Sequence, residues 1–210
     1  MKECSNCKNG RGSVGLGSAG SGSKGLEAAD RGVSGEEAAP RVCRGVKIDG
    51  TPSLEELRRT PGYPSEERIR KGPVAIIECV EEIPCNPCET ACPQKAISVG
   101  ADITALPVLD EELCTGCGVC VAACPGLAIY VKDYTFEENR ATILFPFEYL
   151  PLPEKGQTVD MTDRFGRVVC EGEVLLVNTS RRNNNTVIIK AAFDKSFFEE
   201  VVSIRRLPRE

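Results

Sequence analysis

The last third of the chain alternates between apolar and polar positions in short runs. Six such runs follow Tyr134, and turn-forming residues such as Pro151, Gly156 and Asn184 separate them. Strands of this number and length are typical of a small antiparallel barrel, so we expect an all-β barrel over residues 134–210. Asp194 is expected to cap a short helical turn before the last strand. The expected strands are residues 141–147, 157–162, 167–170, 173–178, 186–192 and 201–204.

The preceding residues predict fewer regular elements. The β-branched run at residues 74–79 predicts a strand. Ser53, with Glu56 three residues later, forms the capping box of a short helix, and a second helical turn is expected at Ser65. Residues 8–40 are rich in Gly and Ser and have few large apolar side chains, which predicts a flexible tail. The expected segments are a flexible region (1–42), a linker with a short helix (43–73), a middle domain (74–133) and the barrel (134–210).

The cysteine spacing in the middle segment predicts metal chemistry. Eight of the twelve cysteines lie between residues 79 and 124. The second half of this stretch follows the C-x2-C-x2-C-x3-C-P pattern of bacterial ferredoxins. An internal repeat, C-x2-C-x3-C-P-x2-A-I, begins at Cys85 and again at Cys117. The sequence therefore resembles a two-cluster ferredoxin of the α+β class. The residues that match the ferredoxin pattern are Cys114, Cys117, Cys120, Cys124 and Pro125.

Two [4Fe-4S] clusters are expected from this pattern. In two-cluster ferredoxins the fourth cysteine of each run, followed by proline, ligates the cluster of the other run. The backbone at Gly116 and Gly118 can approach a cluster closely, while Pro93 and Pro125 fix the chain after the fourth cysteines. The expected ligands of one cluster are Cys92, Cys114, Cys117 and Cys120. The expected ligands of the other are Cys79, Cys85, Cys88 and Cys124.

Cys79 is the ligand that departs from the pattern. Glu82 stands where the first cysteine of the upstream run would be, and Cys79 lies three residues before it. Cys79 is the expected substitute, giving C-x5-C-x2-C-x3-C-P. A 3Fe cluster held by only three thiolates is the alternative.

Zinc sites and disulfides are the alternatives to iron–sulfur clusters for these cysteines. Four thiolates also suit zinc, but zinc sites usually come from two separated C-x2-C pairs. Disulfides are disfavoured because the first residues form no apolar signal segment. The four remaining cysteines allow a third metal site, but three sequence-distant segments would have to converge, and Cys170 in its alternating strand is expected to be a small buried hydrophobe. These four are Cys4, Cys7, Cys43 and Cys170.

Charge and composition narrow the function classes. The chain has no histidine, which removes a Ser-His-Asp triad and the usual general base, so no catalytic site of its own is expected. The segment from Val74 to Lys132 contains two lysines and eight carboxylates, which give it a net charge of −6. Such a surface should repel nucleic acid and anionic membranes and favour a partner with a basic patch. No apolar run approaches a membrane span, and a cytoplasmic location is expected.

A wider resemblance suggests a partner. Residues 73–93 and 114–129, followed by the G-x-T-V-D-x-x-D-R-x-G phrase at 156–166, resemble ferredoxin-type subunits of FAD-dependent amino-acid or amine dehydrogenases. Those dehydrogenases are related to proline and hydroxyproline dehydrogenases and to sarcosine oxidase. The resemblance implies an iron–sulfur subunit of a hetero-oligomer that relays single electrons from a flavoprotein dehydrogenase. A stand-alone ferredoxin and a non-redox, metal-stapled interaction module are the alternatives.

Overall fold

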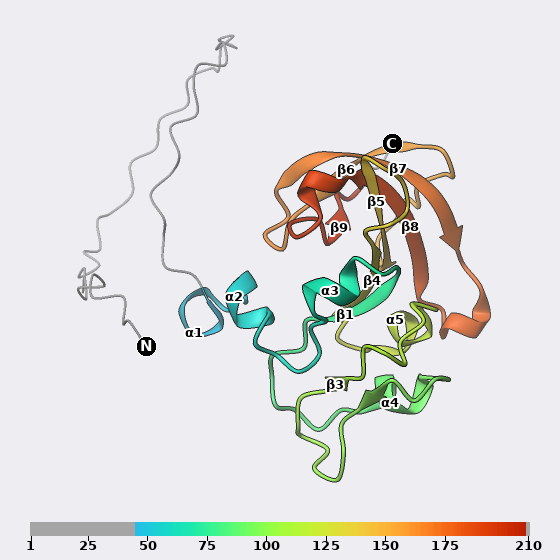
Figure 1. Cartoon of the computed structure of the whole chain (residues 1–210). Coiled ribbons are helices and arrows are strands. Elements are labelled where there is room, and N and C mark those ends of the chain that lie inside the picture. The colour runs from blue at the N-terminus through green and yellow to red at the C-terminus, as the bar shows by residue number, and fades with distance from the viewer. Residues whose placement is uncertain (1–44, 209–210) are drawn as a thin grey trace, which may run out of the picture. The chain divides into compact units, whose positions relative to one another are not determined.

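The computed structural model describes residues 45–208. Their main element is a seven-stranded antiparallel sheet with the order β1-β4-β5-β8-β7-β6-β9 (Figure 1). The strands are β1 (Val74–Ile77), β4 (Ile129–Asp133), β5 (Arg140–Phe147), β6 (Thr158–Thr162), β7 (Val168–Asn178), β8 (Val187–Asp194) and β9 (Ser203–Ile204). Two short 3-10 helices, η1 (Arg181–Asn183) and η2 (Lys195–Phe197), accompany the last strands.

Five strands follow Tyr134, where the sequence predicted six. The runs at 167–170 and 173–178 belong to the single strand β7, which pairs with both β6 and β8. Gly172 lies at the join, where a Cβ atom would come within 2.9 Å of the Ala192 carbonyl oxygen and would overlap Met161. Glycine at this position therefore lets the neighbouring strands pack closely. A register shift between Val174 and Leu176 bends the long strand.

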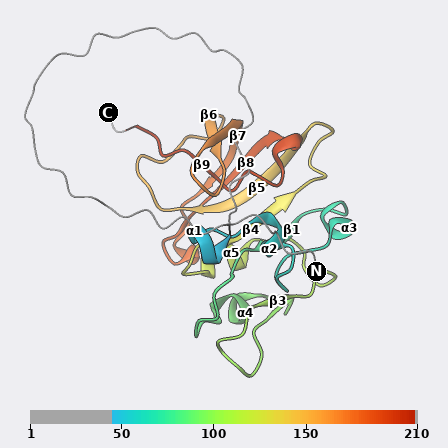
Figure 2. The ribbon, with the colours of Figure 1, turned by 90° about the vertical axis from the view of Figure 1, so that its left-hand side faces the viewer.

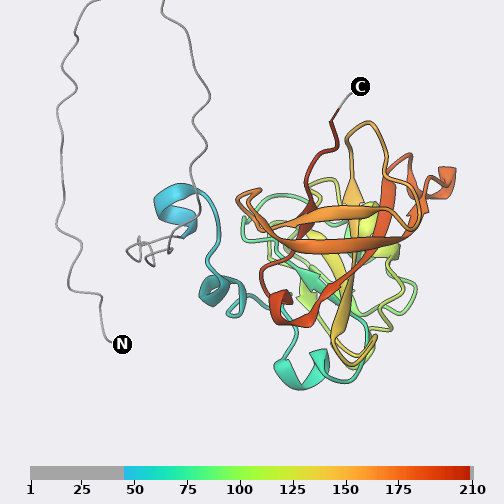
Figure 3. The same ribbon diagram turned by 90° about the horizontal axis from the view of Figure 1, so that it is seen from above.

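One face of the sheet encloses the larger core. Alternate residues of β5 and β8, including Phe145 and Phe193, are buried together with Met161 of β6 and Ile204 of β9. Seen from above, the orange segments lie across the yellow strand, as expected for a strongly curled sheet (Figure 3). Within the described residues the strand order is open, with β1 and β9 at its edges. The predicted barrel stays a prediction, because these pairings do not join the two edges.

The cysteine-rich segment shares this sheet. Strand β4 pairs with β1 on one side and with β5 on the other, so the sheet continues across residue 133. Two short helices, α4 (Pro87–Ala91) and α5 (Val119–Ala123), pack against each other. Figure 2 shows them below the strands, together with a small sheet formed by β2 (Ile97–Ser98) and β3 (Val108–Leu109). A second core, which includes Ile77, Ile97 and Ile129, lies between these elements.

In the described part of the chain, three one-turn helices precede strand β1 in the sequence. They are α1 (Val46–Asp49), α2 (Leu54–Leu57) and α3 (Glu66–Ile69). The capping box of Ser53 and Glu56 and the cap at Ser65 are confirmed, whereas α1 was not predicted. Leu57 is fully buried, and the carbonyl of Gly62 accepts a hydrogen bond from Ile77 N (3.1 Å), so this segment lies across the cysteine-rich region. None of the helices among residues 45–208 is both long and apolar enough to cross a membrane.

Candidate metal centres

One cavity brings together the cysteines of the downstream run and the last cysteine of the upstream run. It has an empty volume of about 320 Å³. Its walls also include Pro93 and the two glycines of the downstream loop, Gly116 and Gly118. The four cysteines in this first cavity are Cys92, Cys114, Cys117 and Cys120.

A second cavity gathers the complementary set. Its empty volume is about 390 Å³, and Ile77, Ile83 and Pro125 form part of its wall. Cys79 lines this cavity in spite of its unusual spacing in the sequence. The four cysteines in this second cavity are Cys79, Cys85, Cys88 and Cys124. The structure thus groups all eight predicted ligands into the two expected sets.

The short helices exchange cysteines between the cavities. Cys88 lies within α4 and reaches the second cavity, whereas Cys92, at its C-terminal end, reaches the first. In α5 the directions are reversed, because Cys120 reaches the first cavity and Cys124 the second. Both helix-ending cysteines leave the helix in an extended conformation, with ψ of 111° at each. That conformation turns the chain away from its own loop.

Backbone amides donate hydrogen bonds to three of the sulfur atoms. Ala96 N donates to Cys92 Sγ (3.3 Å), and at the equivalent place in the repeat Ala128 N donates to Cys124 Sγ (3.4 Å). Ala75 N of β1 donates to Cys114 Sγ (3.5 Å). Hydrogen bonds of this kind stabilise negative charge on sulfur, as a thiolate ligand requires.

Gly116 and Gly118 are required by both conformation and space. Both have positive φ, of 67° and 81°. A Cβ atom on Gly116 would come within 2.7 Å of Pro73 Cβ and of the Pro73 carbonyl oxygen. A Cβ atom on Gly118 would overlap the end of the Leu144 side chain. The loop therefore packs against the sheet at a distance that only glycine allows.

The donor chemistry of both cavities fits iron–sulfur clusters. Among the residues described, no three His, Cys, Asp or Glu side chains lie close enough to hold a single metal ion. The four thiols of each set instead line one common cavity. Four thiolates around one cavity suit a cluster, because [4Fe-4S] clusters are held by four cysteines.

Comparison with known proteins agrees with this chemistry. The model of the 4Fe-4S binding domain matches residues 107–130. Ferredoxin-3 of Chlorobaculum tepidum is 45% identical over 51 residues, which cover 21% of this chain and 77% of that protein. The chain belongs to the ferredoxin family.

Two further relatives match this chain over less than half of their own length. An uncharacterized ferredoxin of Methanocaldococcus jannaschii is 39% identical over 70 residues, covering 32% of this chain and 42% of that protein. The polyferredoxin-like subunit of the aliphatic sulfonate oxidoreductase of Pyrococcus furiosus is 44% identical over 72 residues, covering 30% and 39%. The chain thus spans about two fifths of the length of these two relatives. No solved structure matches it.

Three thiols in the two cavities of this ferredoxin have raised pKa values. Burial, followed by the charges of Cys114, Cys117 and Cys92, raises the pKa of Cys120 to about 12. Burial, followed by Cys124, raises the pKa of Cys88 to about 11, and the same two causes raise the pKa of Cys79. These three thiols are therefore protonated at neutral pH, and binding a metal cluster as thiolates would release their protons.

One contact of this ferredoxin was not predicted from its sequence. Arg164, in the turn between β6 and β7, forms an ion pair with Glu78, the residue before Cys79. The D-R-x-G phrase drew attention to Arg164, but nothing in the sequence pairs two residues that are 86 positions apart.

Of the four remaining cysteines, Cys170 is the one that the structure describes, and it lines neither cavity. Cys170 is a half-buried residue of β7 that packs against the larger core, as expected for a small hydrophobe. Cys4, Cys7 and Cys43 lie outside the described residues. The third metal site therefore stays a prediction.

Proposed function

We propose that this ferredoxin is an electron-transfer subunit with two [4Fe-4S] clusters. The first cavity would hold one cluster through Cys92, Cys114, Cys117 and Cys120. The second would hold the other through Cys79, Cys85, Cys88 and Cys124. The observation that carries the proposal is the sorting of eight cysteines into two sets of four by exchange between α4 and α5.

The role of the protein is to hold and tune these groups. When bound, each cluster supplies a centre that accepts and donates one electron. Ala96, Ala128 and Ala75 direct their N–H groups at three sulfur atoms, which favours the thiolate form. Ile77, Ile97 and Ile129 bury the inner side of the sites, which limits water there. Cys117 is exposed, so the first site lies close to the surface.

The proposed electron donor is a partner flavoprotein that oxidises an amino acid or amine. The resemblance of three sequence phrases to subunits of such complexes supports this partner, as does a relative that is itself an oxidoreductase subunit. We further propose a hetero-oligomer in the cytoplasm, with the C-terminal strands as a small barrel that binds the partner. The carboxylates around the cysteine-rich segment favour a basic docking surface on that partner.

Anaerobic purification of the full-length chain from its native host tests this function. Iron, zinc and flavin are measured in whatever elutes together. About eight irons per chain and a co-purifying flavoprotein are expected. Eight irons on a lone chain would favour a stand-alone ferredoxin, and zinc without iron would refute both redox functions.

Substitution of Cys79 tests the second ligand set. Cys79→Ala should reduce the iron content from about eight to about seven per chain and give the paramagnetic signal of an oxidised 3Fe cluster. Cys170→Ala is the matched control, because Cys170 lies outside both cavities, and it should leave the iron content unchanged. An unchanged iron content in Cys79→Ala would exclude Cys79 as a ligand.

A further inference from the structure

The turn between β6 and β7 reaches the cysteine-rich segment through Arg164. Its Nε donates to Glu78 Oε2 (2.8 Å), and its Nη2 donates to Glu78 Oε1. Its Nη1 donates to the carbonyl oxygen of Glu199 (3.1 Å). Arg164 therefore contacts both carboxylate oxygens and one backbone carbonyl, a geometry that fixes the direction as well as the distance of the carboxylate.

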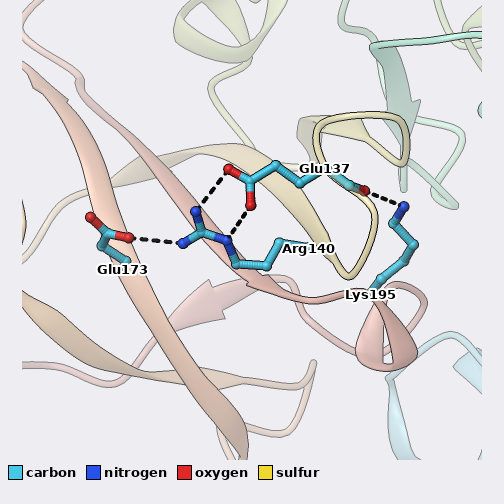
Figure 4. A network of polar contacts seen from close by, with 4 residues as sticks. All are labelled: Glu137, Arg140, Glu173 and Lys195. Atoms are coloured by element: carbon cyan, nitrogen blue, oxygen red, sulfur yellow. Dashed lines mark hydrogen bonds and ion pairs between the residues drawn. The ribbon is translucent and has the colours of Figure 1, made fainter.

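This ion pair differs from the other ion pairs of the described residues by its burial. The Arg164 side chain is 14% exposed and that of Glu78 is 6% exposed. By contrast, Arg140 pairs with Glu137 and Glu173 at side-chain exposures of 40% or more (Figure 4). Surface pairs contribute little, whereas removal of one partner from a buried pair leaves an uncompensated charge. The Arg164 contact should therefore matter for the chain around Glu78.

Glu78 is placed to control the direction of Cys79. Ile76 packs into the larger core while Ile77 faces the second cavity, and the alternation continues with Glu78 toward Arg164 and Cys79 toward the cavity. Glu78 N also donates to the carbonyl oxygen of Ala128 (2.8 Å). Both the backbone and the side chain of Glu78 are therefore fixed immediately before Cys79.

The chain on the other side of Cys79 gives much less support. Residues 81–84 are all exposed, and no helix or strand lies between β1 and α4. The C-x5-C spacing thus places Cys79 at the start of the surface segment that joins β1 to α4, whereas Cys85 lies at its end. Its position depends on the residues that precede it.

We propose that Arg164 is a positioning residue for Cys79 and so secures the fourth thiolate of the second cavity. The inference rests on the proposed two-cluster function and deepens it. The C-terminal strands would then help to decide whether the second centre carries four irons or three. Arg164 touches no ligand directly and acts through Glu78.

Arg164→Gln tests the inference in the full-length chain. The variant should lose about one of eight irons and show the signal of an oxidised 3Fe cluster, while the first centre keeps its own signal. In a Cys79→Ala background, Arg164→Gln should cause no further change in cluster type, because both substitutions would act on the same ligand.

Two further variants separate positioning from general stability. Arg140→Gln removes a similar guanidinium contact far from the cavity, and it should leave iron content and signals unchanged. Glu78→Leu combined with Arg164→Met removes the ion pair without leaving a buried charge, and it should reproduce the loss of the fourth iron. Eight irons in that double variant, or equal loss from both centres in Arg164→Gln, would overturn the inference. Absence of iron from the wild type would instead refute the proposed function.

Discussion

Lys132 is a fully buried lysine, and its replacement by methionine should stabilise the protein. The side chain lies on β4 and is 1% exposed. Its Nζ donates to the Phe198 carbonyl oxygen (2.7 Å) and lies 5.2 Å from the centre of the Phe198 ring. Burial is the main cause that lowers the pKa of Lys132 from 10.5 to about 7, and Arg164 lowers it further against the opposing effects of Glu78 and Glu199.

The lowered pKa sets both the size and the sign of the effect. Between pH 10.5 and 7 the unfolded chain binds a proton that the folded protein does not, so stability falls as the pH decreases, and below pH 7 the loss is constant. At 1.36 kcal/mol per pH unit, the full loss is about 5 kcal/mol, of which about 4 kcal/mol is present at pH 7. Lys132→Met removes this loss, but the Phe198 carbonyl loses its donor, at about 1–3 kcal/mol. The net gain at pH 7 should be about 1–3 kcal/mol.

Anaerobic urea denaturation, followed by circular dichroism, measures this gain. Wild type should become more stable by about 2 kcal/mol between pH 7 and pH 9, relative to Lys132→Met at the same pH values. Lys190→Met on β8 is the control, because Lys190 is only half-buried, and it should keep the wild-type pH dependence. A Lys132→Met variant that is less stable than wild type at pH 7, with the same pH dependence, would refute the reasoning.

Four other substitutions test the packing. Gly116→Ala should destabilise the protein by about 2–5 kcal/mol, because it combines an unfavourable positive φ with a clash against the Pro73 backbone. The midpoint of thermal bleaching of the cluster absorbance should therefore fall. Gly118→Ala should lower that midpoint less, because the added methyl group meets only the end of the Leu144 side chain. Adding Leu144→Ala to this variant should restore part of the loss. Equal effects of Gly116→Ala and Gly118→Ala would contradict this reasoning. Phe145→Ala should cost about 3–5 kcal/mol in urea denaturation, and a loss below about 1 kcal/mol would show that Phe145 is not a core residue.

Local sequence signals predicted the short elements and the two cysteine sets. The capping box at Ser53 and the cap at Asp194 were found where expected, because each depends on residues within one turn. The cysteine sets were also predictable, because the spacing within each run fixes which thiols leave the loop. Even so, the ligand role of Cys79 stays a prediction, which its place in the wall of the second cavity supports.

The pairing of distant segments was not predictable from local signals. The sequence did not show that the runs at 167–170 and 173–178 form the single strand β7, in which Gly172 leaves space for Met161. Likewise, Arg164 and Glu78 each resemble an ordinary surface charge, and only the tertiary fold buries them together. Contacts over such sequence separations depend on the whole fold, which short-range patterns do not encode.

The exchange of cysteines between α4 and α5 also constrains how the protein acquires its metal. Each helix carries a thiol in both cavities. In the proposed two-cluster protein, the first cluster inserted would therefore already fix one end of the two helices that the second cluster needs. Maturation should therefore be cooperative, and a population of half-loaded chains should be scarce during reconstitution with limiting iron. The same linkage would make oxidative damage at one centre loosen its neighbour.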